Sequence, residues 1–191
     1  SRSLASALSK PSMPESLDLA YGKAEDQIKI NRGHWLHRIG YLGESVQMGI
    51  FDGGFHNVDS IRHLEVLRNE NRLLCVRNFV KSCEDPLRHH SHGTYVLSCI
   101  AADVPGELVG TAPKVSVCLA LTEDGSSEHK IEEDNWVAAL EWADSLGCDI
   151  INSSLGYTQF DDSTQRRTAA DLTGQVSRAS QAASIAASKG I

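Results

Sequence analysis

Short apolar segments alternate with helical patterns along most of this chain, and this alternation limits the possible folds more than any other feature. The apolar segments cover residues 45–54, 72–80, 114–121 and 149–155. The helical patterns cover residues 94–102, 128–146 and 175–189. Strands that alternate with helices at this spacing form βαβ units. We therefore expect an α/β fold with a mostly parallel sheet and helices on both faces.

A histidine stands where the first of these helices begins. His92 is followed by Gly93, and then by Val96, Cys99 and Ile100 at the spacing of one buried helical face. The positive partial charge of a helix N-terminus disfavours an imidazolium ring and favours the neutral form. A neutral imidazole accepts a proton, so His92 is a candidate general base.

An aspartate stands where the first apolar segment ends. Asp52 is followed directly by Gly53 and Gly54. An Asp-Gly pair on its own is a common turn signal. In open α/β sheets, however, functional groups gather at the carboxyl ends of the strands, and Asp52 occupies such a position.

Together these segments resemble the subtilisin-like (subtilase) serine peptidases, in which a hydrophobic strand runs into Asp-x-Gly and a later His-Gly-Thr-x-Val opens a helix. Three further stretches match in the same order. They are Gly110–Pro113, the helical stretch Trp136–Asp149, and the strand Ile150–Gly156 with its Ser-Leu-Gly substrate edge. The resemblance covers roughly residues 21–191 and implies a subtilisin-like fold.

The resemblance also implies a serine endopeptidase that hydrolyses peptide bonds through an Asp-His-Ser triad. In that triad His92 is the base and Asp52 orients it and stabilises the imidazolium. Two positions depart from the family pattern. Gly53 replaces the usual Thr or Ser, and Tyr95 replaces a second histidine that many members carry. The alternative is a noncatalytic member that uses the same fold to bind a peptide or a partner.

The nucleophile motif of the family, Gly-Thr-Ser-x-Ala after an oxyanion-binding Asn, does not occur in this sequence. The chain ends at Ile191, where another strand is expected to begin. We therefore expect residues 17–191 to be the N-terminal portion of a catalytic domain, with a sheet incomplete at its C-terminus. Residues 1–16, rich in Ser, Pro and Ala, are expected to be a flexible lead-in. The expected partner is the C-terminal part of the same domain, and this piece alone is expected to be inactive.

The resemblance implies a polypeptide substrate held between two loops in a strand-like clamp. The loops contribute Gly125, Ser126 and Ser127 on one side and Ser154, Leu155 and Gly156 on the other. Glu123, Asp124 and Glu128 surround the first loop. Because carboxylates beside a groove attract cations, we expect basic or neutral side chains to be preferred there.

Composition argues against several other classes of function. A net charge of −7 and a pI near 5.6 disfavour nucleic acid or an anionic membrane as the main partner. The sequence has no apolar run of the ~18 residues that a membrane span needs, and its start has no signal-peptide pattern. By resemblance we expect an extracellular or periplasmic location.

A metal site is a further alternative, because imidazole suits Zn, Cu or Ni. His89, His90 and His92, with Cys83 and Asp85 nearby, are its candidate ligands, but no second ligand pair has zinc-like spacing. The resemblance implies no required cofactor, and the sequence does not indicate the structural calcium ion that the family allows.

The five cysteines show no metal-ligand spacing. Cys99, Cys118 and Cys148 lie in apolar patterns and are expected to be buried. Cys75 and Cys83 flank an expected strand and loop, where a disulfide between them is a possible arrangement.

Overall fold

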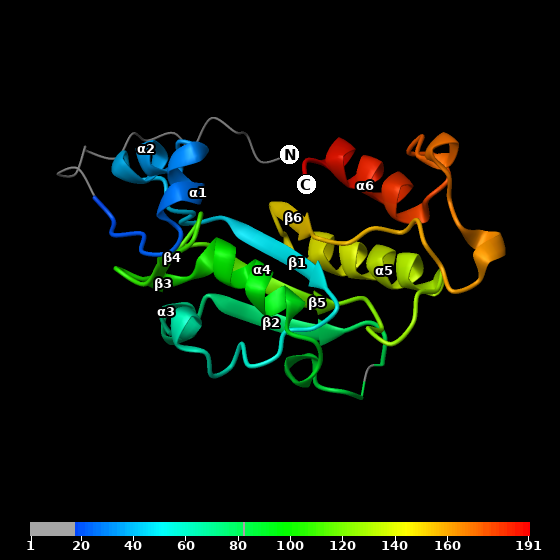
Figure 1. The fold of residues 1–191 in the computed structure, drawn as a ribbon, viewed down its shortest axis with the longest axis horizontal. Helices are drawn as coiled ribbons and strands as arrows, with labels where there is room; N and C mark the ends of the chain where they lie inside the picture. The colour runs from blue at the N-terminus through cyan, green and yellow to red at the C-terminus, as the bar shows by residue number, and fades with distance from the viewer. Residues whose placement is uncertain (1–17, 82) are drawn as a thin grey trace.

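The computed structural model describes residues 18–81 and 83–191, so the expected lead-in over residues 1–16 lies outside the described residues. A sheet of four strands runs through the centre of the molecule (Figure 1), in the order β2-β5-β1-β6. The strands are β1 (Gln47–Asp52), β2 (Leu73–Asn78), β5 (Ser116–Leu121) and β6 (Ile150–Ser153). All three strand pairs are parallel, as the alternation of strands and helices predicts.

Helices cover both faces of this sheet. On one face lies α4 (His92–Ala101), and on the other lie α5 (Ile131–Leu146) and α6 (Arg178–Lys189), side by side in Figure 1. Successive side chains of a strand point to opposite faces. In β1, Ile50 therefore packs in one core cluster with Leu97 of α4, and Phe51 packs in the other with Trp136 of α5.

The smaller elements lie at the end of the sheet where β1 begins, at the left of Figure 1. They are α1 (Glu25–Ile30), α2 (Gly33–Arg38), α3 (Glu65–Asn69) and an antiparallel ribbon of β3 (Asp103–Val104) with β4 (Leu108–Val109). Gly147 ends α5 with a φ of 79°, and Gly190 ends α6 with a φ of 100°. Glycine adopts such left-handed angles without strain, which explains why both helices stop there. No helix in the described ranges has both the length and the apolar character needed to cross a membrane.

Two predictions about side chains need correction. Val96 and Ile100 of the expected buried face of α4 are partly buried and pack against the core, but Cys99 is exposed. The fully buried residues of this helix are Gly93, Thr94, Leu97, Ser98 and Ala101. The helix turns this way because its first turn, rather than its apolar residues alone, is fixed against β1.

The possible Cys75–Cys83 disulfide is also absent from the structure, where both are free thiols. Cys75 lies on β2 directly opposite Cys118 on β5, with the two sulfur atoms 2.6 Å apart. Because Cys75 packs in the core cluster under α5 while Cys83 is exposed in a loop, the two side chains face different surroundings.

Candidate active site

The structure brings Asp52 and His92 together at the carboxyl end of the sheet. Asp52 is the last residue of β1 and His92 is the first residue of α4. Nδ1 of His92 lies 2.8 Å from Oδ1 and 2.9 Å from Oδ2 of Asp52. The Asp52 side chain is fully buried, whereas 48% of the His92 side chain is exposed. A proton on Nδ1 is donated to the carboxylate in this arrangement, which leaves Nε2 free to accept another.

The first turn of α4 packs closely against the segment that follows β1. The N–H of Gly93 donates to the carbonyl of Gly54 at 3.0 Å. A Cβ atom at Gly93 would lie 2.6 Å from that carbonyl oxygen and 2.8 Å from Cβ of Asp52. Thr94 Oγ1 donates to the carbonyl of His56 at 2.8 Å. The Gly and Thr that follow His92 therefore hold the helix where its histidine meets the aspartate.

The Asp52 carboxylate also accepts a backbone hydrogen bond. Gly53 N–H donates to Oδ1 of Asp52 at 2.8 Å. Gly53 has no side-chain hydroxyl, so at this position a backbone donor, together with the imidazole, satisfies the carboxylate. Such hydrogen bonds offset the cost of burying a polar group.

A cleft of about 380 Å³ opens beside this pair, between the loops that follow β1, β5 and β6. Its lining residues are Asp52, Gly53, His90, His92, Glu123, Asp124, Gly125, Glu128, Ser154, Leu155 and Gly156. The predicted substrate residues Gly125 and Ser154–Gly156 thus share one cleft with the predicted catalytic pair. Ser126 and Ser127 lie on the same loop but do not line the cleft. The parallel strands explain this convergence, because their carboxyl ends meet at the same edge of the sheet.

Two glutamates beside the cleft have perturbed acidities. Burial raises the pKa of Glu123, although hydroxyl groups of Tyr157 and Thr122 donate to its carboxylate and oppose the shift. Burial, followed by repulsion from Glu123 and Glu128, raises the pKa of Glu132 to about 7. Oε1 of Glu132 accepts the N–H of Asp124 at 3.1 Å, and Oε2 is buried without a hydrogen-bond partner in the described part of the chain.

Sequence reasoning missed Tyr157 as a contributor to this region. Its hydroxyl group donates to Oε1 of Glu123 at 2.7 Å. The carbonyl of Tyr157 accepts from Arg167 at 2.6 Å, and Arg167 forms two hydrogen bonds with Glu133 at 2.6 and 2.7 Å. The sequence shows only that polar residues follow the ends of β5 and β6. It does not show that Glu123 after β5 contacts Tyr157 after β6.

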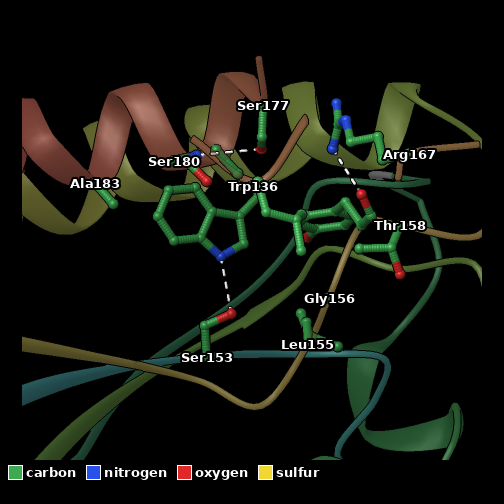
Figure 2. A pocket seen from close by; sticks show the side chains of 12 residues that line it. Trp136, Ser153, Leu155, Gly156, Thr158, Arg167, Ser177, Ser180 and Ala183 are labelled. Carbon is green, nitrogen blue, oxygen red and sulfur yellow. Dashed lines mark hydrogen bonds between the residues drawn. The ribbon is translucent and has the colours of Figure 1, made fainter. Parts of the chain in front are cut away.

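A second cavity, of about 350 Å³, shares Leu155 and Gly156 with the cleft. Figure 2 shows the ring of Trp136 inside it, with Nε1–H donated to Oγ of Ser153 at 3.0 Å. Residues from the start of α6 lie along its other side (Figure 2). The Ser-Leu-Gly segment therefore separates a polar cleft from a more apolar cavity.

The metal alternative receives no support from the geometry. Over residues 18–81 and 83–191, no group of three or more His, Cys, Asp or Glu side chains is placed to hold a metal ion. The three histidines have separate contacts. His92 bonds to Asp52, Nε2 of His89 lies 3.3 Å from Glu84, and Nδ1 of His90 accepts the N–H of His92.

The comparison with known sequences gives one consistent result. The profile of the Subtilase family matches residues 43–190. Subtilisin DY from Bacillus licheniformis is 31% identical over 120 residues, which are 61% of this chain and 39% of that protein. Subtilisin E from Bacillus subtilis (strain 168) is 32% identical over 126 residues, which are 63% of this chain and 29% of that protein. The chain thus spans less than half the length of these curated relatives.

Solved structures share the fold at lower sequence identity. The crystal structure of MycP1 from Mycobacterium smegmatis matches with a TM-score of 0.55 and 17% identity, over 93% of this chain and 45% of that one. A structure of the periplasmic assembly from the ESX-5 inner membrane complex matches with a TM-score of 0.55 and 18% identity, over 94% of this chain and 46% of that one.

Proposed function

The chain belongs to the subtilase family, and we propose that it acts within a serine endopeptidase in which Asp52 and His92 are two members of an Asp-His-Ser triad. The observation that carries the proposal is the contact of the buried Asp52 carboxylate with Nδ1 of His92, at 2.8 and 2.9 Å. In this proposal the Nδ1–H group of His92 donates to Asp52, and Nε2 is the base.

The proposed reaction uses these groups in sequence. Nε2 of His92 takes the proton of a serine hydroxyl as its oxygen attacks the carbonyl carbon of the scissile peptide bond. The Asp52 carboxylate stabilises the imidazolium that forms. His92 then returns the proton to the leaving amine, and water attacks the acyl-enzyme by the same route.

The nucleophile belongs, in this proposal, to residues outside 1–191. No Gly-Thr-Ser occurs in the sequence, and in the described part of the chain His92 Nε2 forms no hydrogen bond with a serine. We therefore expect residues 1–191 alone to hydrolyse no peptide. The loss of a triad member costs several orders of magnitude in rate.

The proposed substrate is a polypeptide in an extended conformation. In this proposal its main chain lies between Gly125, in the loop of residues 125–127, and the segment Ser154–Gly156, which line the same cleft as Asp52 and His92. We further propose an extracellular or periplasmic location. The solved neighbour from a periplasmic assembly is consistent with that location.

A fluorophosphonate probe tests this proposal, because it labels a serine only when a base activates it. In the intact gene product we expect one labelled serine outside residues 1–191, and much slower labelling in His92→Ala. Tyr95→Ala is the matched control on the same helix, since its side chain is 64% exposed. The absence of labelling, together with retained peptide binding, would instead favour the noncatalytic binding module.

A further inference from the structure

Glu123 is a partly buried carboxylate of the cleft that has no ion pair in the described part of the chain. The cleft lining contains four carboxylates and neither Lys nor Arg. Asp52 is bonded to His92, and Asp124 lies 3.9 Å from Lys81. Glu128 is exposed to solvent. It is unfavourable to remove a carboxylate from water without pairing it with a cation. Glu123 is therefore the carboxylate of the cleft that a bound cation stabilises most.

The two oxygen atoms of Glu123 differ in their contacts. Oε1 accepts from Oγ1 of Thr122 at 2.9 Å and from the Tyr157 hydroxyl at 2.7 Å. These two donors occupy both lone-pair positions of that oxygen. Oε2 has no hydrogen bond within the described residues, so it alone is free to accept from a ligand.

Glu123 lies next to the proposed catalytic pair. A Cβ atom at Gly53 would have Cβ of Glu123 as its nearest neighbour outside the adjacent residues, at 3.6 Å. Gly53 in turn bonds to Oδ1 of Asp52. Glu123 also lines the same cleft as Asp52 and His92, so a substrate side chain in that cleft can reach Glu123 beside the pair.

We propose that Glu123 is a specificity-determining residue that binds the ammonium group of a substrate lysine lying beside the Asp52–His92 pair. This proposal rests on the peptidase function proposed above. It goes further because it assigns one side chain of the cleft to one class of substrate residue.

The proposal favours lysine over arginine. An arginine guanidinium binds a carboxylate best when it donates to both oxygens, as a planar fork. Oε1 of Glu123 is already occupied, so one oxygen remains, which suits the compact ammonium group of lysine. Tyr157 is the positioning residue in this arrangement. Burial keeps its pKa far above the ordinary value, so its hydroxyl group remains a donor to Glu123.

The test is a scan of a short, otherwise neutral peptide. Lysine, arginine or norleucine, which is the uncharged analogue of lysine, occupies each position in turn. We would measure kcat/KM with the intact gene product, and the dissociation constant of each peptide with its His92→Ala variant. At one position the lysine peptide should have a kcat/KM roughly 10- to 100-fold higher than the norleucine peptide, and a dissociation constant lower by a similar factor, the range of a hydrogen bond to a charged group. Arginine should be no better than lysine there.

Two variants assign the preference to Glu123. Glu123→Gln should reduce the ratio of kcat/KM for the lysine peptide to that for the norleucine peptide to near unity. The exposed control Glu141→Gln should leave this ratio unchanged. Tyr157→Phe should raise the arginine-to-lysine ratio, because it frees a lone pair on Oε1; a purely structural role for Tyr157 would not change that ratio.

Equal values for lysine and norleucine at every position of the wild-type protein would overturn the proposal, as would a preference that persists in Glu123→Gln. The binding measurement separates this failure from failure of the peptidase function. If no peptide is cleaved but the His92→Ala protein still prefers lysine through Glu123, the peptidase proposal fails and the lysine site stands.

Discussion

Gly93 and Asp52 lie so close that no side chain fits between them. A Cβ atom on Gly93 would lie 2.8 Å from Cβ of Asp52 and 2.7 Å from Cε1 of Phe55. Contacts this short are repulsive, and both neighbours belong to the buried interior. The glycine after His92 is therefore a requirement for bringing α4 onto the end of β1.

The first prediction follows from that contact. Gly93→Ala should displace the start of α4 and lower kcat/KM of the intact gene product by ~100-fold or more, because small misplacements of catalytic groups are costly. It should also lower the free energy of unfolding by ~1–3 kcal/mol through overpacking. Peptide hydrolysis and denaturant titration measure the two effects, with the exposed Tyr95→Ala as control. Normal kcat/KM in Gly93→Ala would show that the contact does not position His92.

The second prediction concerns the ion pair behind the cleft. Arg167 and Glu133 are 7% and 1% exposed, and Arg167→Met leaves the Glu133 carboxylate buried without its cation. Such a loss costs ~3–5 kcal/mol of unfolding free energy. The matched control is Arg178→Met, which breaks a pair with Asp134 whose side chains are 55% and 39% exposed. An exposed pair contributes ~0–1 kcal/mol. Urea titrations that give equal losses for the two variants would contradict this interpretation.

The extent to which the sequence predicts the fold differs between local and distant features. The strand with Asp52 and the helix with His92 can be predicted from the sequence, because each is a continuous apolar pattern with a polar residue at its end. Contacts between distant segments have no such pattern. Tyr157 reaches Glu123 across 34 positions, and Cys75 lies against Cys118 across 43. Strand order decides these contacts, and strand order depends on how the whole sheet assembles.

The burial of α4 illustrates a second reason. Val96 and Ile100 follow helical spacing and are partly buried, yet Leu97 and Ala101 are the apolar residues that are fully buried. The close contact at Gly93 and the bond from Thr94 to His56 decide which side of the helix is fully buried. Periodicity identifies the helix, but tertiary contacts decide which of its apolar stripes is buried.

The third prediction is a pH dependence of stability that originates at Glu132. Its pKa of about 7 in the folded state exceeds its ordinary value of 4.5. Between these pH values the folded protein retains a proton that the unfolded chain has released, so the Glu132 contribution to stability falls as pH rises through this window and is constant above it. Its charged neighbours are Glu123 and Glu128, which both oppose its ionisation.

Glu132→Gln should remove this contribution. The substitution leaves one buried atom without a partner, as Oε2 already is, but carries no charge. Relative to wild type, its free energy of unfolding should be similar at pH 4 and higher by ~3 kcal/mol at pH 8, since each unit between the two pKa values corresponds to ~1.4 kcal/mol. Thermal or urea unfolding across that range is the measurement, with Glu141→Gln as the exposed control. A constant difference at every pH would exclude Glu132 as the source.

A double-mutant cycle on the intact gene product tests the central claim, that Asp52 acts through His92, most directly. We would measure kcat and KM for Asp52→Ala, His92→Ala and the double variant with one peptide. His92→Ala should lower kcat by ~10⁴–10⁶-fold with little change in KM, the range seen when members of a triad are removed. The double variant should lose little more than His92→Ala, because residues that act as a unit have non-additive effects. Near-normal turnover in His92→Ala, or losses that multiply in the double variant, would contradict the account.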